Sequence, residues 1–212
     1  KNMNIEREMR FYLPLEKLKS QQTILQQFNY GGRFHEITIM YDNPNPRHTF
    51  YSPFIDGRLR LRAATPTDNK SNNGYGLVSW KQRIPELKNE IMRHENEIEF
   101  NFNPLELSAV QSIFENILHC PRISSYERYR NHYEKNGIHI TLDEFPFGLM
   151  LEFEISSKNE EQKIIEILPQ FKLNSVNASH YSCDDMYREL CLKENKQLKS
   201  NILFNDLDMP KL

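Results

Sequence analysis

The stretch "IDGRLRLRAA" (residues 55–64) alternates arginine with leucine from position 58 to position 62. In a β-strand, successive side chains point to opposite faces, so Arg58, Arg60 and Arg62 share one face. Neighbouring arginines on that face lie about 7 Å apart and repel one another. Such a row needs an anion opposite it, and the other strands indicate where that anion lies.

The composition is that of one ordinary domain without a strongly basic surface. The 212 residues are 38% hydrophobic and 26% charged, with a formal net charge of −2. This balance excludes the broad basic footprint of a duplex nucleic-acid binder. Cys120, Cys183 and Cys191 have no metal-type spacing and do not pair evenly, which predicts a reducing compartment, the cytoplasm. We expect no membrane span, because no run of about 18 apolar residues is present.

The chain shows no internal repeat or internal domain boundary. We expect a single domain over residues 1–193, followed by a polar tail over 194–212, and a monomer or homodimer. Eight segments are predicted to be strands: 4–14, one within 52–64, 34–42, 77–84, 94–102, 125–133, 137–145 and 148–156. The fold class is therefore α+β, mainly antiparallel β.

Four other segments are predicted to be helices. They cover residues 14–28, 104–118, 159–171 and 183–192. In the first, Leu15 shares an apolar stripe with Leu18, Leu25 and Phe28. In the second, Val110, Phe114 and Ile117 are expected to face inward.

The polar faces of the strands are unusual in composition. A solvated face normally mixes neutral and charged polar residues, but here seven strands present almost only carboxylates and guanidinium groups. Glu6 stands beside Glu8, and Glu152 beside Glu154. Like charges in these positions cost free energy unless an opposite charge lies between them. A hard divalent cation would satisfy the carboxylate pairs, and a polyanion would satisfy the arginine row, because guanidinium matches phosphate oxygens two at a time.

This pattern predicts an inverted barrel, in which the charged faces line the inside and the apolar faces look outward toward the helices. A closed barrel of about eight strands has room inside for one small ligand. The arginines of residues 55–64 would then point into a tunnel, toward phosphate groups.

The strand motifs resemble those of the CYTH proteins, the triphosphate tunnel metalloenzymes. "IEREMRF" (5–11) resembles the family's ExExK strand, with Arg10 in place of the lysine. "RLRLR" (58–62) is similar to its LRxR strand, and "RHENEIEF" (93–100) to its RxExE strand. The segments "SWKQR" (79–83), "YERYRNHY" (126–133) and "HITLDEFPFGLMLEFEI" (139–155) resemble three further strands in the same order.

The resemblance implies an eight-stranded tunnel that binds a small-molecule triphosphate with Mg²⁺ or Mn²⁺. The favoured activity is hydrolysis of inorganic triphosphate, thiamine triphosphate, a nucleoside triphosphate or an RNA 5′-triphosphate. An adenylate cyclase that forms cyclic AMP and pyrophosphate is the alternative within this fold. A polyphosphate or nucleotide sensor without catalysis is the alternative from another class.

Particular residues are assigned to these roles by their place in the motifs. The expected metal ligands are Glu6, Glu8, Glu97, Asp143, Glu152 and Glu154. The expected phosphate-binding residues are Arg58, Arg60, Arg62, Lys81, Arg83, Arg128 and Arg130. Glu6, Glu8, Arg10 and Lys81 are the expected catalytic residues.

Overall fold

All eight segments predicted as strands form strands, and they close into a barrel. The computed structural model describes residues 4–70, 73–84, 92–157 and 160–212. The barrel strands are β1 (Asn4–Leu13), β2 (Asn29–Tyr41), β3 (Gly57–Pro66), β4 (Tyr75–Arg83), β5 (Arg93–Phe102), β6 (Arg122–Lys135), β7 (Ile138–Phe145) and β8 (Gly148–Ile155). Their order is β2-β3-β4-β5-β1-β8-β7-β6, and pairing of β2 with β6 closes the ring. Every pairing within the ring is antiparallel.

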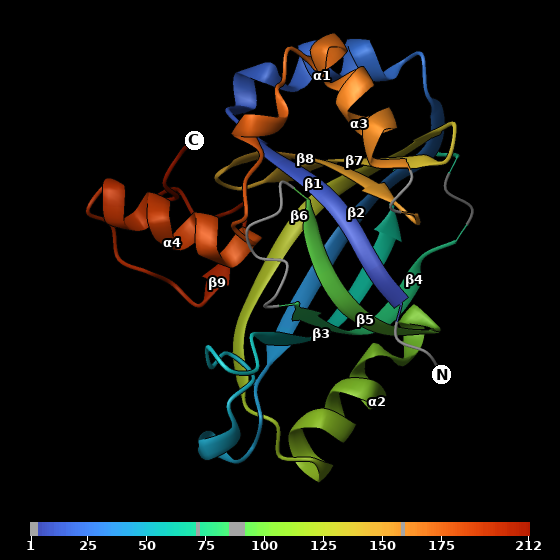
Figure 1. Cartoon of the computed structure of the whole chain (residues 1–212). Helices are drawn as coiled ribbons and strands as arrows, with labels where there is room; N and C mark the ends of the chain where they lie inside the picture. Colours follow the sequence, from blue (N-terminus) through green and yellow to red (C-terminus); the bar gives the residue numbers. More distant parts are fainter. Residues whose placement is uncertain (1–3, 71–72, 85–91, 158–159) are drawn as a thin grey trace.

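Four α-helices of the described chain lie around this ring. They are α1 (Leu18–Leu25), α2 (Leu107–Ser112), α3 (Glu161–Ile167) and α4 (Cys183–Lys193). Figure 1 shows α1 and α3 above the barrel and α2 below it, while α4 lies beside one end. Within the described residues, no helix is long and apolar enough to cross a bilayer.

The hydrophobic core lies outside the barrel wall, as the alternation of the strands predicts. Met9 on β1 and Phe153 on β8 face outward and are buried beneath α1 and α3. A second cluster lies between α2 and the outer faces of β2, β3 and β4, and a third packs α4 against Phe145 and Phe147. The barrel is therefore stabilised from its outside, since apolar burial is the main favourable contribution to folding.

The segment after α4 packs back onto the barrel. Its short strand β9 (Asn201–Ile202) pairs in parallel with β6 at Ser125 and Tyr126. Ile202 and Met209 are buried in the cluster beneath α4.

Two apolar residues expected to face inward are exposed instead. The side chain of Leu15 is 39% exposed, because it belongs to a 3₁₀ turn (Leu15–Lys17) whose periodicity differs from that of α1. Ile117 is 67% exposed, while Val110 and Phe114 pack inward as expected. The difference at Ile117 comes from a π-helical turn (Ile113–Ile117), which inserts an extra residue and rotates Ile117 away from the barrel.

The external core can be tested with two identical substitutions on the outer faces of strands. Phe153 is fully buried between Phe11 and Phe171, whereas Phe100 on β5 is 52% exposed. Phe153→Ala should lower the free energy of unfolding by about 3–5 kcal/mol through the cavity it leaves. Phe100→Ala should cost clearly less, because its ring is already half in water. Equal losses in urea denaturation would contradict a core that lies beneath the helices.

Candidate active site

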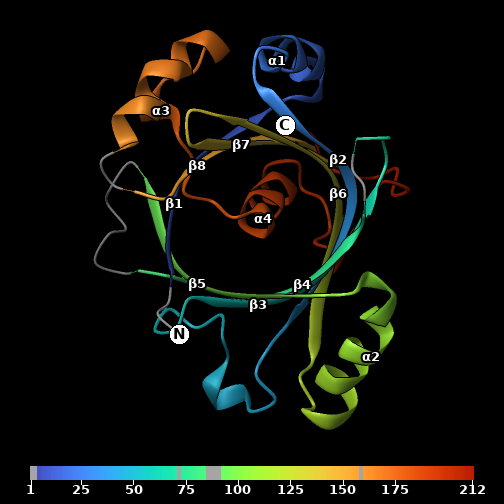
Figure 2. The same ribbon diagram turned by 90° about the vertical axis from the view of Figure 1, so that its right-hand side faces the viewer.

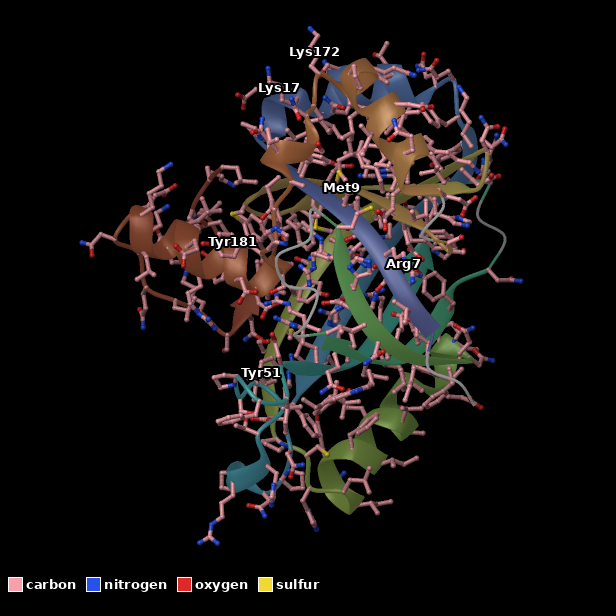
Figure 3. The ribbon with its side chains drawn as sticks, in the orientation of Figure 1. Arg7, Met9, Lys17, Tyr51, Lys172 and Tyr181 are labelled. Atoms are coloured by element: carbon pink, nitrogen blue, oxygen red, sulfur yellow. The ribbon has the colours of Figure 1, made fainter. Side chains whose placement is uncertain are left out.

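The charged faces of the strands point into the barrel and meet one another there. Arg7 and Met9, labelled in Figure 3, belong to the outward face of β1, whereas Glu6, Glu8 and Arg10 belong to its inward face. Between strands, the register places opposite charges side by side: Arg10 stands opposite Glu152, and Lys81 opposite Glu97. These cross-strand pairs explain how each strand tolerates like charges along its own length.

The three arginines of β3 have three different environments. Arg58 lies near carboxylates of α4, with Nη2 at 3.4 Å from Asp185 and Nε at 3.9 Å from Asp184. Arg62 donates from Nε to the Thr38 hydroxyl at 3.1 Å and lies 3.6 Å from Glu36. Arg60 makes no ion pair with any described residue, and its buried Nε has no hydrogen-bond partner there. The row therefore contains one guanidinium group that is not neutralised by direct contact.

Arg60 and Arg62 line an internal cavity of about 360 Å³. The other charged residues of the lining are Glu6, Arg10, Lys81, Glu97, Glu99, Arg128, Arg130, Glu152 and Glu154. Its uncharged lining residues are Tyr75, Leu77, Asn101, Tyr126, Met150 and Cys183. The cavity lining is thus mostly ionic, which is unsuited to an apolar ligand.

Apart from Arg10 and Lys81, the two signs of charge in the lining come from different sides of the barrel. All the carboxylates of the lining come from β5, β1 and β8, which are consecutive strands in the ring. The four arginines other than Arg10 come from β3 and β6, the neighbours of β2 on the opposite side. We call these two surfaces the acidic wall (Glu6, Glu97, Glu99, Glu152 and Glu154) and the basic wall (Arg60, Arg62, Arg128 and Arg130).

The acidic wall has more negative charge than its neighbours neutralise. Lys81 lies between Glu6 and Glu97, with Nζ at 2.5 Å and 2.8 Å from their carboxylates. Glu154 makes no ion pair with any described residue, and burial together with the nearby Glu6 carboxylate raises its pKa to about 8. Burial and Glu97 likewise raise the pKa of Glu6, despite the opposing effect of Lys81. A cation added here would relieve this repulsion.

Glu152 shows the opposite behaviour within the same wall. Its burial would raise its pKa, but Arg10 and Arg130 overcome this and hold the pKa well below its usual range. Arg10 donates from Nε to Glu152 at 2.8 Å and from Nη2 to Glu8 at 2.7 Å. Arg10 therefore acts as a fixed link between two carboxylates and has few donors left for a ligand.

The basic wall is held in place by buried carboxylates behind it. Asp143 accepts from both Arg128 and Arg130 at 2.7–2.8 Å. Glu36 on β2 accepts from Arg128 at 2.7 Å and from the Tyr75 hydroxyl. Burial would raise the pKa of Glu36, but Arg128 and Arg62 lower it far below its ordinary value. These contacts fix the guanidinium groups before any ligand arrives.

The structure brings most of the predicted site residues to one cavity and places four others behind it. Within the described chain, Glu8, Arg58, Arg83 and Asp143 are not part of the cavity lining. Glu8 is buried against Arg10 and Arg93, and Asp143 against Arg128 and Arg130. Their contacts indicate that they position other charged groups.

Sequence reasoning did not identify Glu36, Tyr75 or Asp185 as part of this network. Glu36 shares its face of β2 with Thr38, so the alternation of "FHEITIMYD" (34–42) could have revealed it. Asp185 lies on a helix outside the barrel, where strand alternation gives no signal.

Comparison with known proteins gives no match by sequence: no family model and no curated protein matches the chain. Solved structures do match. A candidate adenylate cyclase from Vibrio parahaemolyticus has a TM-score of 0.67 at 20% identity over 87% of this chain and 98% of the other. A Pyrococcus horikoshii protein has a TM-score of 0.65 at 19% identity, with the same coverage of 87% and 98%.

The chain therefore shares the closed eight-stranded barrel fold of these solved structures. The same barrel also matches a chain of the Schizosaccharomyces pombe Mediator head module, with a TM-score of 0.57 at 10% identity over 79% of this chain and 94% of that one. Since one fold can serve different functions, the activity has to be argued from the side chains of the cavity.

The support behind the basic wall can be tested at Glu36, whose side chain is fully buried. Glu36→Gln removes the charge that faces Arg62 and Arg128, so the free energy of unfolding should fall by about 3–5 kcal/mol. As a control, Glu160→Gln breaks the exposed pair with Lys163 and should leave stability nearly unchanged. An unchanged melting temperature in Glu36→Gln would show that the two arginines do not depend on it.

Proposed function

We propose that this protein is a divalent-metal-dependent hydrolase of triphosphate compounds and that the reaction takes place in the lumen. The observation that carries the proposal is the opposition of the two walls across one cavity, with the unpaired Arg60 on the basic wall and surplus carboxylate on the acidic wall. A ligand that carries both several negative charges and a bound cation satisfies both walls at once.

Arg60 and Arg62 are the proposed first contacts of the phosphate chain. Arg60 offers donors that no carboxylate occupies, and Arg62 is already oriented by Thr38. Arg128 and Arg130 are held by Asp143, so they can face phosphate oxygens without first losing conformational freedom. Arginine suits this role because its planar group matches two phosphate oxygens.

The acidic wall fits a hard divalent cation by its donor chemistry. Glu6, Glu97, Glu152 and Glu154 would hold the ion, because carboxylate oxygens favour Mg²⁺ or Mn²⁺ over softer metals. As the side chains stand, no group of three or more His, Cys, Asp or Glu within the described residues is arranged to hold a metal, since Lys81 and Arg10 occupy these carboxylates. A bound ion would supply neutralisation of the charge that develops on the phosphate oxygens.

Lys81 is the proposed partner of the phosphate chain at the acidic wall. Its ammonium group is buried beside Glu6 and Glu97, which raise its pKa and keep it charged after the opposing effect of burial. Glu8 positions Arg10 and Arg93 from behind the wall. In this arrangement, the chain binds and orients the triphosphate for in-line attack by water.

Cyclisation of ATP to cyclic AMP is the second candidate, and an uncharged part of the cavity lining favours it. Tyr75, Leu77 and Asn101 form an uncharged part of the lining, and a nucleoside could lie against them. The triphosphate would then be gripped by the same walls, but a ribose hydroxyl would replace water as the nucleophile.

A product assay with variants of both walls tests the proposal. The protein is incubated with Mg²⁺ or Mn²⁺ and either inorganic triphosphate, thiamine triphosphate, ATP or a 5′-triphosphate RNA. We expect orthophosphate release that disappears with a chelator and with Glu154→Gln, but persists in Glu166→Gln on the exposed face of α3. Pyrophosphate and cyclic AMP in equal amounts would support the cyclase instead. Tight binding without any product would identify a sensor and overturn the proposal.

Arg60→Ala tests the phosphate contact separately. Loss of a hydrogen-bonded charged group should raise the dissociation constant for triphosphate about 10- to 100-fold. Arg7→Ala on the outer face of β1 is the matched control and should leave the affinity unchanged. Equal affinities of the two variants in calorimetric titration would place the phosphates elsewhere.

A further inference from the structure

One end of the barrel is closed by the start of α4. Figure 2 looks along the barrel, and α4 is seen through the ring of strands, while Figure 1 shows that the helix lies outside the barrel beside one end. Arg10 donates to the Tyr181 carbonyl at 3.1 Å, and Arg93 to the His180 carbonyl at 3.1 Å, which fixes the segment before the helix. Tyr181 lies between the barrel and α4 in Figure 3.

Asp185 connects this closed end to the lumen arginines. Its Oδ2 accepts from Arg83 at 2.8 Å and from Arg58 at 3.4 Å. The same oxygen accepts from Ser182, the N-cap of α4, in a capping box. One carboxylate thus both starts the helix and neutralises two arginines that strand alternation directs into the tunnel.

Arg58 is neutralised at this end without being fully hydrogen-bonded. Its side chain is 5% exposed, and its Nε and Nη1 atoms have no hydrogen-bond partner among the described residues. The carboxylates of Asp56 and Asp184 are near, but at 3.6 Å and 3.9 Å they are too far for good hydrogen bonds. Arg58 therefore retains N–H donors that suit a phosphate group. Its charge, however, is already neutralised by the nearby carboxylates, which also occupy the space beside it.

The position of Arg58 extends the phosphate-binding row by one step. Arg60 and Arg62 line the cavity, and Arg58 follows on the same face about 7 Å closer to α4. A longer phosphate chain would reach Arg58 and Arg83 next, but the Asp185 carboxylate already pairs with both arginines there.

We propose that Asp185 sets the length limit of the phosphate chain that the tunnel accepts, by taking the place of a further phosphate group on Arg58 and Arg83. The inference rests on the proposed function, since it concerns the same tunnel. It makes Asp185 a specificity-determining residue: a triphosphate fits between Arg62 and the closed end, and inorganic tetraphosphate is excluded by the carboxylate.

Calorimetric titration with inorganic triphosphate and inorganic tetraphosphate, each with Mg²⁺, tests this limit. The wild-type protein should bind triphosphate more tightly than tetraphosphate. Asp185→Asn keeps an oxygen for the capping box and removes the charge, so it should improve tetraphosphate binding relative to triphosphate by about tenfold or more. Asp184→Asn, which leaves the capping box intact, should shift the ratio less but in the same direction.

Glu189→Gln on the exposed face of α4 is the matched control, because it makes the same charge change on the same helix. Its ratio should equal that of the wild type. The length limit would be overturned if Asp185→Asn left the ratio of tetraphosphate to triphosphate affinity unchanged, or if the wild type bound both compounds equally well. Either result would leave the triphosphate site in place. Failure of the wild type to bind either compound would refute the proposed function itself and remove the basis of the inference.

Discussion

The burial of charge inside the barrel is the constraint on which the rest of this structure depends. Arg10, Lys81, Arg128 and Glu152 are nearly inaccessible to water, and removing charges from water costs several kcal/mol for each ion. Direct pairing largely offsets this cost without adding much stability, so the barrel needs its favourable free energy from elsewhere. The apolar outer face supplies it, and this explains why the helices pack around the wall while the lumen remains polar.

Pairing is incomplete at two places, and both places line the same cavity. Arg60 on the basic wall and Glu154 on the acidic wall make no ion pair with described residues, whereas Arg128 and Glu6 on the same walls do. A protein selected for stability alone would gain by neutralising both or by replacing them with apolar residues. Their presence inside one cavity favours the proposed binding site over a salt-bridged lattice, since unsatisfied groups of this kind concentrate at functional sites.

Strand alternation alone predicted the fold and most of the lumen. It identified Arg60, Arg62 and the glutamates of β1 and β8 because a period of two assigns each side chain to a face. It could not predict which charge pairs with which, because that depends on the spatial order of the strands: Glu6 meets Lys81 although 75 residues separate them. The role of Arg58 depends on a helix 127 residues away, and the exposure of Ile117 on a π-helical turn that has no clear sequence signal.

In the proposed function, a triphosphate and its metal lie between the two walls. Crystals grown with Mn²⁺ and a slowly hydrolysed triphosphate analogue would test it through the anomalous scattering of manganese. We expect an anomalous peak among Glu6, Glu97, Glu152 and Glu154, with phosphate density on Arg60 and Arg62. Manganese or phosphate bound only on the outer surface, with the lumen side chains still paired to one another, would contradict it.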